Sequence, residues 1–165
     1  MNANDTDLRE GEVRFINEAP FAPDGQLRFI GRVRSPWRSR SDCPKNLREA
    51  RERGGSALLE IAAPYRPALS GLAPGQWIML LTWLHEARRD LALQAPRHAA
   101  EPRGTFSLRS PVRPNPIGLH LVRIVGLDAS TGSIAIDAVD VLDGTPLLDI
   151  KPYLPSVDIP PMEAD

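Results

Sequence analysis

Short segments in which apolar and polar residues alternate recur along the chain, and this pattern predicts β-strands. They span residues 12–16, 27–34, 57–62, 117–127 and 133–142. A further segment, residues 77–84, is apolar on both faces, which fits either a centrally buried strand or a short core helix. Its length and the preceding Gly75 favour the strand. About seven short strands with little helix predict an all-β fold, either a barrel or a sandwich.

The connections between these strands contain one predicted helix and one long polar loop. Asn46 followed by Glu49 resembles the start of a short helix, although Asn is a variant of the usual Ser or Thr in a capping box. The glycine pair at positions 54 and 55 would end that helix. Residues 88–103 show no periodicity and are predicted to form a polar loop.

Residues 104–118 form a stiff, positively charged segment. Three prolines within six residues prevent a regular helix and leave few backbone N–H groups for a β-ladder. This backbone carries Arg109 and Arg113. The segment therefore looks like a binding loop set between two strands. The alternative is a structural crossover whose arginines point into water.

Charge is distributed unevenly along the chain. The net charge is −1, which taken alone argues against nucleic-acid binding. Residues 27–125, however, hold 17 Lys and Arg against 7 Asp and Glu, while the two ends together hold 3 against 14. This distribution suits one positive surface that could bind phosphates. An equal alternative is that the acidic ends fold over the basic middle and cancel its charge.

Composition also limits the compartment in which the protein works. Cys43 is the single cysteine, so the chain has no internal disulfide framework. The longest apolar run, residues 77–84, is too short to cross a membrane. Residues 1–7 are polar and acidic, unlike a signal peptide. The simplest interpretation is a cytoplasmic protein without a membrane partner.

Common catalytic and nucleotide-binding motifs are missing from the sequence. It contains no glycine-rich dinucleotide loop, no P-loop, no zinc-ligand spacing and no Ser/His/Asp elbow. We therefore expect none of the common nucleotide-binding folds and no metal. His85 and Glu86 follow the apolar run and suggest a polar site, with a purely structural histidine as an equal alternative.

Two longer motifs carry a resemblance to a known family. The segment GTFSLRSPVRPNPIGL at residues 104–119 resembles a signature of the TrmO (YaeB/TsaA-like) family, and DVLDGTPLLDIKPY at residues 140–153 is similar to its second signature. The resemblance covers about residues 27–158. It leaves residues 1–26 as an N-terminal extension, either an edge strand or an arm, and residues 159–165 as a C-terminal tail.

The resemblance implies a fold and an activity. The expected fold is a compact, single-sheet β-barrel with a few short helical or loop insertions. The expected cofactor is S-adenosyl-L-methionine, bound by a homodimer near the subunit interface. The expected reaction is methyl transfer to N6 of threonylcarbamoyladenosine next to the anticodon of tRNA. The chain departs from the family pattern at Lys45-Asn46 and at His120. These departures bear on the identity of the substrate more than on cofactor binding.

The resemblance also assigns site residues, position by position. It assigns cofactor binding to Pro44, Lys45, Asn46, His85, Glu86, Arg109, Leu119, Asp140, Val141, Leu142 and Asp143. The expected tRNA contacts are Arg34, Arg38, Arg113, Asn115 and Lys151.

The residue types fit these roles. Arg109 can hold the cofactor's carboxylate bidentately, and the carboxylates of Asp140 and Asp143 can bind its ribose hydroxyls or amino group. The acceptor nitrogen is a poor nucleophile, so a base would help, and Asp143 and His85 are the candidate catalytic residues. Two alternatives stay open: a barrel that binds the cofactor but methylates a non-tRNA acceptor, and a non-catalytic effector-binding protein.

Overall fold

The computed structural model describes residues 8–16, 25–97 and 99–161. The chain divides into two compact units. Met1–Gln26 and Leu84–Ile117 form one, called here the small unit, and Leu27–Trp83 and Gly118–Asp165 form the barrel unit. The predicted N-terminal extension and C-terminal tail lie in part outside the described residues, at 1–7, 17–24 and 162–165. The domain boundaries drawn from the sequence stay a prediction.

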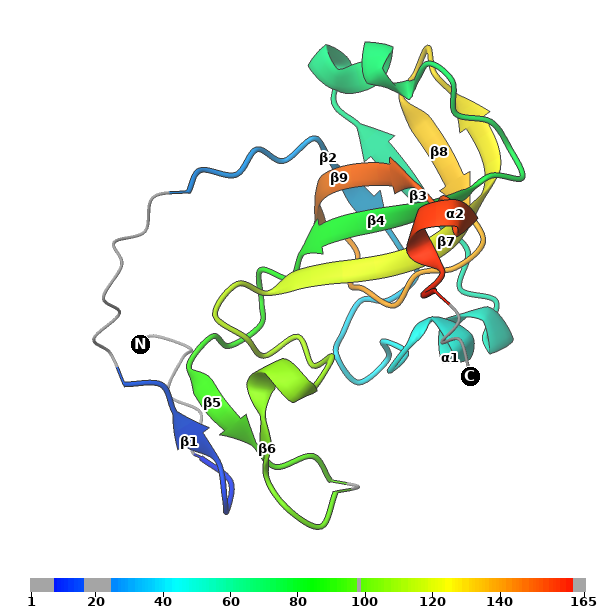
Figure 1. The fold of residues 1–165 in the computed structure, drawn as a ribbon. Helices are drawn as coiled ribbons and strands as arrows, with labels where there is room; N and C mark the ends of the chain where they lie inside the picture. The colour runs from blue at the N-terminus through cyan, green and yellow to red at the C-terminus, as the bar shows by residue number, and fades with distance from the viewer. Residues whose placement is uncertain (1–7, 17–24, 98, 162–165) are drawn as a thin grey trace. The chain divides into compact units, whose positions relative to one another are not determined.

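Six strands close into a barrel in the barrel unit (Figure 1). They are β2 (Gly31–Arg34), β3 (Ala57–Ile61), β4 (Trp77–Trp83), β7 (Ile117–Asp128), β8 (Ser133–Ile136) and β9 (Pro146–Pro152). Their order around the barrel is β2-β3-β8-β7-β4-β9. The predicted all-β barrel is therefore confirmed, and residues 77–83 form a strand, as the length of the apolar run favoured.

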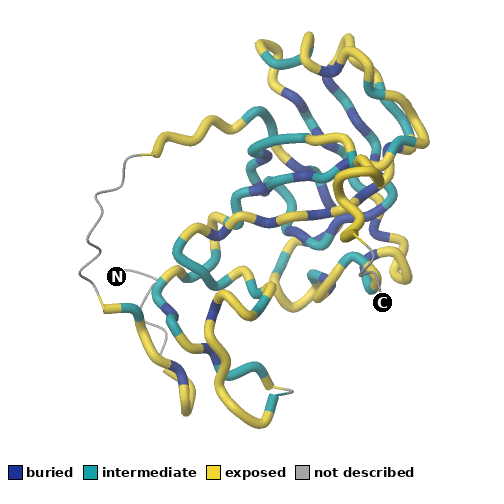
Figure 2. Tube along the Cα trace, in the orientation of Figure 1, coloured by how far each residue is buried: buried dark blue, intermediate teal, exposed yellow. Residues whose placement is uncertain are grey.

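The core of the barrel is built from every second residue of its strands. Along β7, buried and exposed positions alternate from Ile117 to Val125, as Figure 2 shows. Val33 of β2 lies opposite Leu59 of β3, and both side chains are fully buried. Burying a side chain of this size stabilises the fold by about 1.5–3 kcal/mol. The period-2 pattern in the sequence therefore predicted β7 as a strand but not the face that it buries, because Leu119 and Leu121 are exposed and His120 is buried.

Short helices cover the ends of the barrel unit's strands. The helix α1 (Leu47–Glu52) begins at Asn46, whose side chain accepts a hydrogen bond from the Glu49 N–H at 2.9 Å. The Glu49 carboxylate accepts in turn from the Lys45 N–H at 3.1 Å. The predicted helix start at Asn46 is therefore confirmed, although the Glu49 carboxylate accepts from the residue before the N-cap and not from the N-cap N–H of a regular capping box. The other helical segments are η1 (Ala63–Leu69) and α2 (Pro155–Asp158).

The predicted strand over residues 133–142 is wrong in its second half. β8 ends at Ile136, and the Asp137 carboxylate then accepts from the Arg123 N–H at 2.7 Å. Residues 138, 139 and 141 stay buried, but their backbone leaves the ladder, since the Val139 N–H donates to the Gly55 carbonyl at 3.1 Å. Apolar residues continue to be buried there without a neighbouring strand, and the sequence cannot show that difference.

The small unit contains a second sheet, of which the sequence predicted only the first strand, at residues 12–16. Its strands β1 (Val13–Arg14), β5 (Leu91–Gln94) and β6 (Arg103–Gly104) pair in the order β1-β5-β6, and the turn η2 (Thr105–Ser107) follows. The predicted polar loop over residues 88–103 is therefore wrong. β5 buries a leucine and a glutamine at its two ends, a pattern too short and too polar to be recognised as a strand.

Candidate functional site

The predicted site residues fall in both units. The barrel unit contains the three predicted cofactor-binding segments 44–46, 119 and 140–143, together with the predicted tRNA ligands Arg34, Arg38 and Lys151. The small unit contains His85, Glu86, Arg109, Arg113 and Asn115.

In the barrel unit, the turn after β2 is joined to the segment that precedes β9. The Ser35 hydroxyl donates to the Val141 carbonyl at 2.7 Å, and the Asp143 N–H donates to the Trp37 carbonyl at 2.8 Å. Gly144 closes the turn with a φ of +81°, a conformation that favours glycine. These bonds bring residues 35–37 and 141–143 together although about a hundred residues separate them in sequence.

Asp143 is the centre of a small charged cluster. Its Oδ1 accepts from the Ser35 N–H at 3.1 Å and lies 3.4 Å from Arg34 Nε, while its Oδ2 accepts from Arg38 Nη1. Its side chain is only 13% exposed. Arg34 and Arg38, which were both predicted to contact tRNA, therefore bind the carboxylate of Asp143, a predicted catalytic residue. Both oxygens of this carboxylate have partners.

Asp140, three residues earlier, has different neighbours. Its Oδ1 lies 2.8 Å from Nδ1 of His120, and the Nε2 of that ring lies 2.9 Å from the hydroxyl of Thr82. His120 and Thr82 are both buried. In the sequence, His120 stood out only as a departure from the family pattern. No sequence signal pointed to its burial, because the alternation along residues 117–127 sets His120 against the apolar Leu119 and Leu121.

The segment before α1 lies close to Asp140. Burial raises the pKa of the Cys43 thiol to about 11, and the negative charge of Asp140 acts in the same direction. Pro44 is buried, while Lys45 and Asn46 are exposed. The Asn46 side chain caps α1, so its amide oxygen is already in use.

Leu119 lies on the outer face of β7. It is exposed together with Ile117, Leu121 and Val125, which makes an apolar stripe along the strand that Arg123 interrupts. Side chains at alternate positions of a strand point to one face, so this stripe is opposite to the buried His120. Lys151 on β9 is also exposed and lies 2.9 Å from Asp149.

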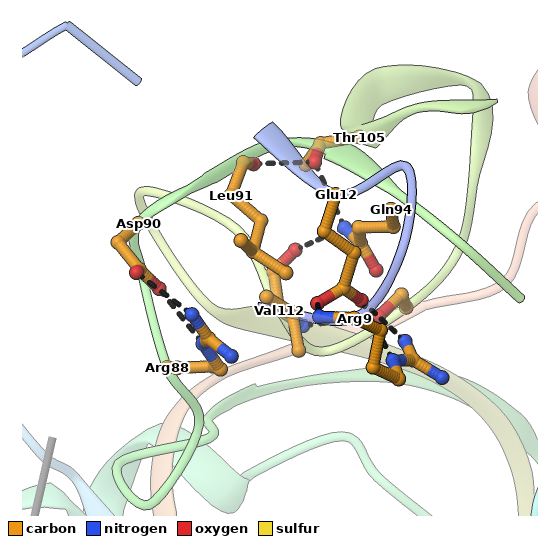
Figure 3. A network of polar contacts seen from close by, with 9 residues as sticks. Arg9, Glu12, Arg88, Asp90, Leu91, Gln94, Thr105 and Val112 are labelled. Atoms are coloured by element: carbon orange, nitrogen blue, oxygen red, sulfur yellow. Dashed lines mark hydrogen bonds and ion pairs between the residues drawn. The ribbon is translucent and has the colours of Figure 1, made fainter. Parts of the chain in front are cut away.

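In the small unit, a buried glutamine braces the proline-rich segment (Figure 3). Gln94 donates from Nε2 to the Val112 carbonyl at 2.7 Å and to the Thr105 hydroxyl at 2.8 Å. The Thr105 hydroxyl donates in turn to the Leu91 carbonyl at 2.6 Å. Thr105 and Val112 of this segment are therefore both attached to the strand β5.

Arg113 works inside the segment that carries it. Its Nη1 donates to the carbonyls of Leu108 at 3.0 Å and Ser110 at 2.9 Å, and its side chain is partly buried. These bonds bend residues 108–113 around Arg109, which is itself exposed. Arg89 adds a bond to the Pro114 carbonyl at 2.7 Å. The guanidinium of Arg113 thus fixes the loop conformation.

Charged pairs lie within the N-terminal segment, at Arg9 and Glu12, and beside it, at Arg88 and Asp90 (Figure 3). Arg88 donates to Asp90 through two bonds of 2.9 Å, and these bonds lower the pKa of Asp90 to about 2. Arg14 of β1 donates to Asp90 at 3.0 Å. Burial raises the pKa of Glu12, but the hydrogen bonds from Arg9 outweigh it and hold that pKa below its usual value. Sequence reasoning could not assign this segment a role.

His85 and Glu86 follow β4 as predicted. Both side chains are about half exposed, and His85 Nε2 lies 4.0 Å from Glu86 Oε1. The Ala87 N–H donates to the Leu84 carbonyl at 2.9 Å, so the pair sits on a tight turn. Within residues 8–16, 25–97 and 99–161, no group of three or more His, Cys, Asp or Glu could hold a metal ion. No helix in this part of the chain is long and apolar enough to span a bilayer.

Comparison with known proteins identifies the family. The model of the tRNA-methyltransferase O N-terminal domain, TrmO_N, matches residues 32–159. The chain belongs to the TrmO_N family. Both signature motifs lie inside the match, so the family predicted from them is confirmed. S-adenosyl-L-methionine is the cofactor of this family, and its enzymes are methyltransferases.

Relatives of the TrmO_N family differ in how they are described. A probable S-adenosyl-L-methionine-binding protein, VirR of Rhizobium radiobacter, is 46% identical over 147 residues, which are 89% of this chain and 80% of VirR. The tRNA (adenine(37)-N6)-methyltransferase of Escherichia coli is 33% identical over 138 residues, which are 79% of this chain and 58% of the enzyme.

Solved structures give the same fold. A crystal structure of TrmO superimposes with a TM-score of 0.67 at 30% identity and covers 87% of this chain. The match includes only 64% of the TrmO chain. This chain therefore corresponds to the TrmO_N part of such proteins, and spans a little over half of the Escherichia coli enzyme.

Proposed function

We propose that this chain is a methyltransferase that uses S-adenosyl-L-methionine to methylate N6 of threonylcarbamoyladenosine next to the anticodon of tRNA. The observation that carries the proposal is that Asp140 lies close to two other predicted segments of the barrel unit, although the Leu119 side chain points to the opposite face of β7 from His120. Asp140 contacts His120, the neighbour of Leu119, and its charge acts on Cys43, the neighbour of Pro44. Residues from distant parts of the sequence thus surround one partly exposed carboxylate.

The charges of the cofactor fit these residues. S-adenosyl-L-methionine carries a sulfonium, an ammonium and a carboxylate. Asp140 supplies negative charge for the cationic end or for a ribose hydroxyl, and we assign Arg109 to the carboxylate, since a guanidinium binds that group in two places. Pro44–Asn46, His85, Glu86, Leu119 and Val141–Asp143 are the other proposed cofactor contacts.

Methyl transfer is an in-line displacement. The bond between sulfur and the methyl carbon breaks as the bond between that carbon and N6 forms, and the electron pair of the old bond returns to sulfur. The proton on N6 must leave to a base. Both oxygens of Asp143 are engaged by Ser35, Arg34 and Arg38, so we favour the exposed His85 as the base. Asp143 then holds the two arginines in place.

We infer that the tRNA phosphates bind the basic residues near this site. Arg34 and Arg38 share the Asp143 carboxylate, and a phosphate could join them at the surface. Asn115, Arg113 and Lys151 are the further proposed contacts. Such contacts give affinity that falls as salt rises. A tRNA substrate would also mean that the protein works in the cytoplasm.

The outer face of β7 supports the proposed homodimer. Its apolar stripe of Ile117, Leu119, Leu121 and Val125 is exposed in the single chain. A second copy would cover these side chains and bring Leu119 into an interface, as the proposed cofactor contact at Leu119 requires. Sedimentation of the protein with and without Leu121→Glu tests this assignment. A change from dimer to monomer supports it, and a wild-type monomer would overturn it.

The proposed reaction is tested with labelled cofactor. The protein is incubated with S-adenosyl-L-methionine carrying a labelled methyl group and with total tRNA that either has or lacks the threonylcarbamoyl modification. We expect label only in the modified tRNA. Arg109→Ala should abolish cofactor binding in calorimetry, while Arg97→Ala, an exposed arginine of the same unit, should leave it unchanged. Normal binding by Arg109→Ala would refute the assignment of that residue.

A second candidate is a barrel that binds the cofactor but has a non-tRNA acceptor or an effector-binding role. It is favoured by VirR, which is described by its cofactor alone and is 46% identical to this chain. In the same experiment, cofactor binding without label in either tRNA would support this candidate and contradict the first.

A further inference from the structure

A buried chain of three polar side chains runs through the barrel wall toward the proposed cofactor site. Thr82 lies on β4, His120 on β7, and Asp140 in the segment after β8. The His120 ring joins the other two, with 2.9 Å from Nε2 to the Thr82 hydroxyl and 2.8 Å from Nδ1 to Asp140 Oδ1. β4 and β7 are neighbours in the barrel, so the backbone fixes the separation of Thr82 and His120.

Gly118 leaves the space that this chain requires. A Cβ atom at position 118 would lie 2.4 Å from Thr82 Oγ1 and 2.5 Å from His120 Nε2. Any side chain there would push the hydroxyl and the ring apart, because real Cβ contacts are longer than 3.0 Å. The hydrogen bond between Thr82 and His120 is therefore built into the packing of the barrel.

The hydrogen-bonding capacity of the groups determines which atom donates to Asp140. An ionised Asp140 only accepts, so Nδ1 of His120 must carry a hydrogen. The Thr82 hydroxyl can donate to Nε2 or accept from it, so it is a partner for the ring in either form. Each buried polar atom of the pair therefore has a partner.

This chain leaves one oxygen of Asp140 for a ligand. Oδ1 is held by His120, whereas no hydrogen bond to Oδ2 is found among the described residues. The Asp140 side chain is 18% exposed, more than the 7% of His120. The nearby Asp143 differs, because Arg34, Arg38 and Ser35 use both of its oxygens. Of the two carboxylates, Asp140 is the one that can accept a further hydrogen bond.

We propose that His120, held by Thr82, is a positioning residue that aims Oδ2 of Asp140 at an ammonium or hydroxyl group of the cofactor. The terminal torsion of an aspartate is soft, so a free carboxylate would rotate and lose part of its affinity when a ligand fixes it. His120 fixes it beforehand. This inference rests on the proposed cofactor binding and assigns a task to a residue at which this chain departs from its family pattern.

Calorimetric titration with S-adenosyl-L-methionine tests the proposal. His120→Leu removes the donor to Asp140, and we expect about tenfold weaker binding, the effect of one hydrogen bond to a charged group. His120→Asn keeps a donor, because its Nδ2 lies near the position of the histidine Nδ1. It should bind within about threefold of wild type. Equal affinity of wild type and His120→Leu would overturn the proposal.

A second pair of variants separates positioning from folding. His120→Leu leaves the Thr82 hydroxyl buried without its partner, so Thr82→Val in the same chain should restore the unfolding temperature while the binding stays about tenfold weaker. In an Asp140→Asn background, His120→Leu should cause no additional loss of affinity, because the two residues act as one. Independent, additive losses would contradict the inference. Failure of the wild type to bind would instead contradict the proposed function.

Discussion

Asp143 accepts a hydrogen bond from the backbone N–H of Ser35 at 3.1 Å, although 108 positions separate the two residues. The same carboxylate is shared by Arg34 and Arg38. The Asp143 side chain thus adds to the bonds through which Ser35 and Trp37 join the turn after β2 to the segment that contains Asp140. The position of the proposed cofactor site depends on this connection.

Replacing Asp143 should therefore weaken the barrel as well as the site. We expect Asp143→Ala to lower the free energy of unfolding by about 1–3 kcal/mol, because it leaves a buried N–H and two arginines without their acceptor. Asp149→Ala, which removes an exposed pair with Lys151, should cost less than about 1 kcal/mol. Urea unfolding of the two variants measures the difference. Equal losses would show that the Asp143 cluster has no structural role.

Gln94 should control the mobility of the proline-rich segment. Gln94→Leu removes the bonds to Val112 and Thr105 from a buried position, so Val112 loses its attachment to β5 while Thr105 keeps its bond to Leu91. We expect backbone amides in residues 108–113 to exchange with solvent at least about tenfold faster, which corresponds to one or two hydrogen bonds. Gln76→Leu, the same change in the barrel unit, is the control and should leave them unchanged.

Low pH should weaken the ion pairs that Asp90 forms with Arg88 and Arg14. Arg88 lowers the pKa of Asp90 to about 2, below the unfolded value of 3.8, so the folded chain binds its proton less tightly. The stabilisation is present above about pH 4 and is lost as the pH falls through 2. Because the carboxylate is partly exposed, the gain is about 1 kcal/mol or less. Thermal unfolding should therefore separate wild type from Asp90→Asn at pH 6, and a gap unchanged at pH 2 would contradict this.

The Cys43 thiol should react slowly with disulfide reagents in the folded chain. Burial and the nearby Asp140 raise its pKa from 9.0 to about 11, so the reactive thiolate is about one hundred times scarcer than for an unshifted thiol. Reaction with a disulfide reagent at pH 8 should be slower by at least that factor. The same protein in urea serves as the control and should react at the ordinary rate. Similar rates in both states would show that the thiol is not shielded.

The sequence predicted the family and the barrel because both leave local signals. Alternation predicted the strand β7, although not its buried face, and Asn46 with Glu49 marked the start of α1. The strand β5 was missed because it is short and buries Gln94, a residue type that seldom signals a strand. Arg113 donates to backbone carbonyls inside its own loop, and no sequence pattern marks such a bond.

The same limit applies to the candidate site. The motifs predicted the same kind of role for Asp140 and Asp143. Only the fold shows that arginines bind the Asp143 carboxylate whereas a histidine holds that of Asp140. His120 and Thr82 are 38 residues apart and meet because β4 and β7 are adjacent. Arg113 was predicted to contact tRNA on the basis of its charge. Its bonds to Leu108 and Ser110 depend on a turn that no pattern describes.

The small unit's main segment leaves the barrel after β4 and returns at β7, two strands that are neighbours in the closed ladder. The Leu84 N–H donates to the Pro116 carbonyl at 2.8 Å, so the two ends of the excursion are already tied together. Residues 85–115 supply no strand to the barrel. This segment could therefore diverge in evolution, or be exchanged for the corresponding segment of a relative, without opening the barrel. The barrel would also keep its His120–Asp140 pair.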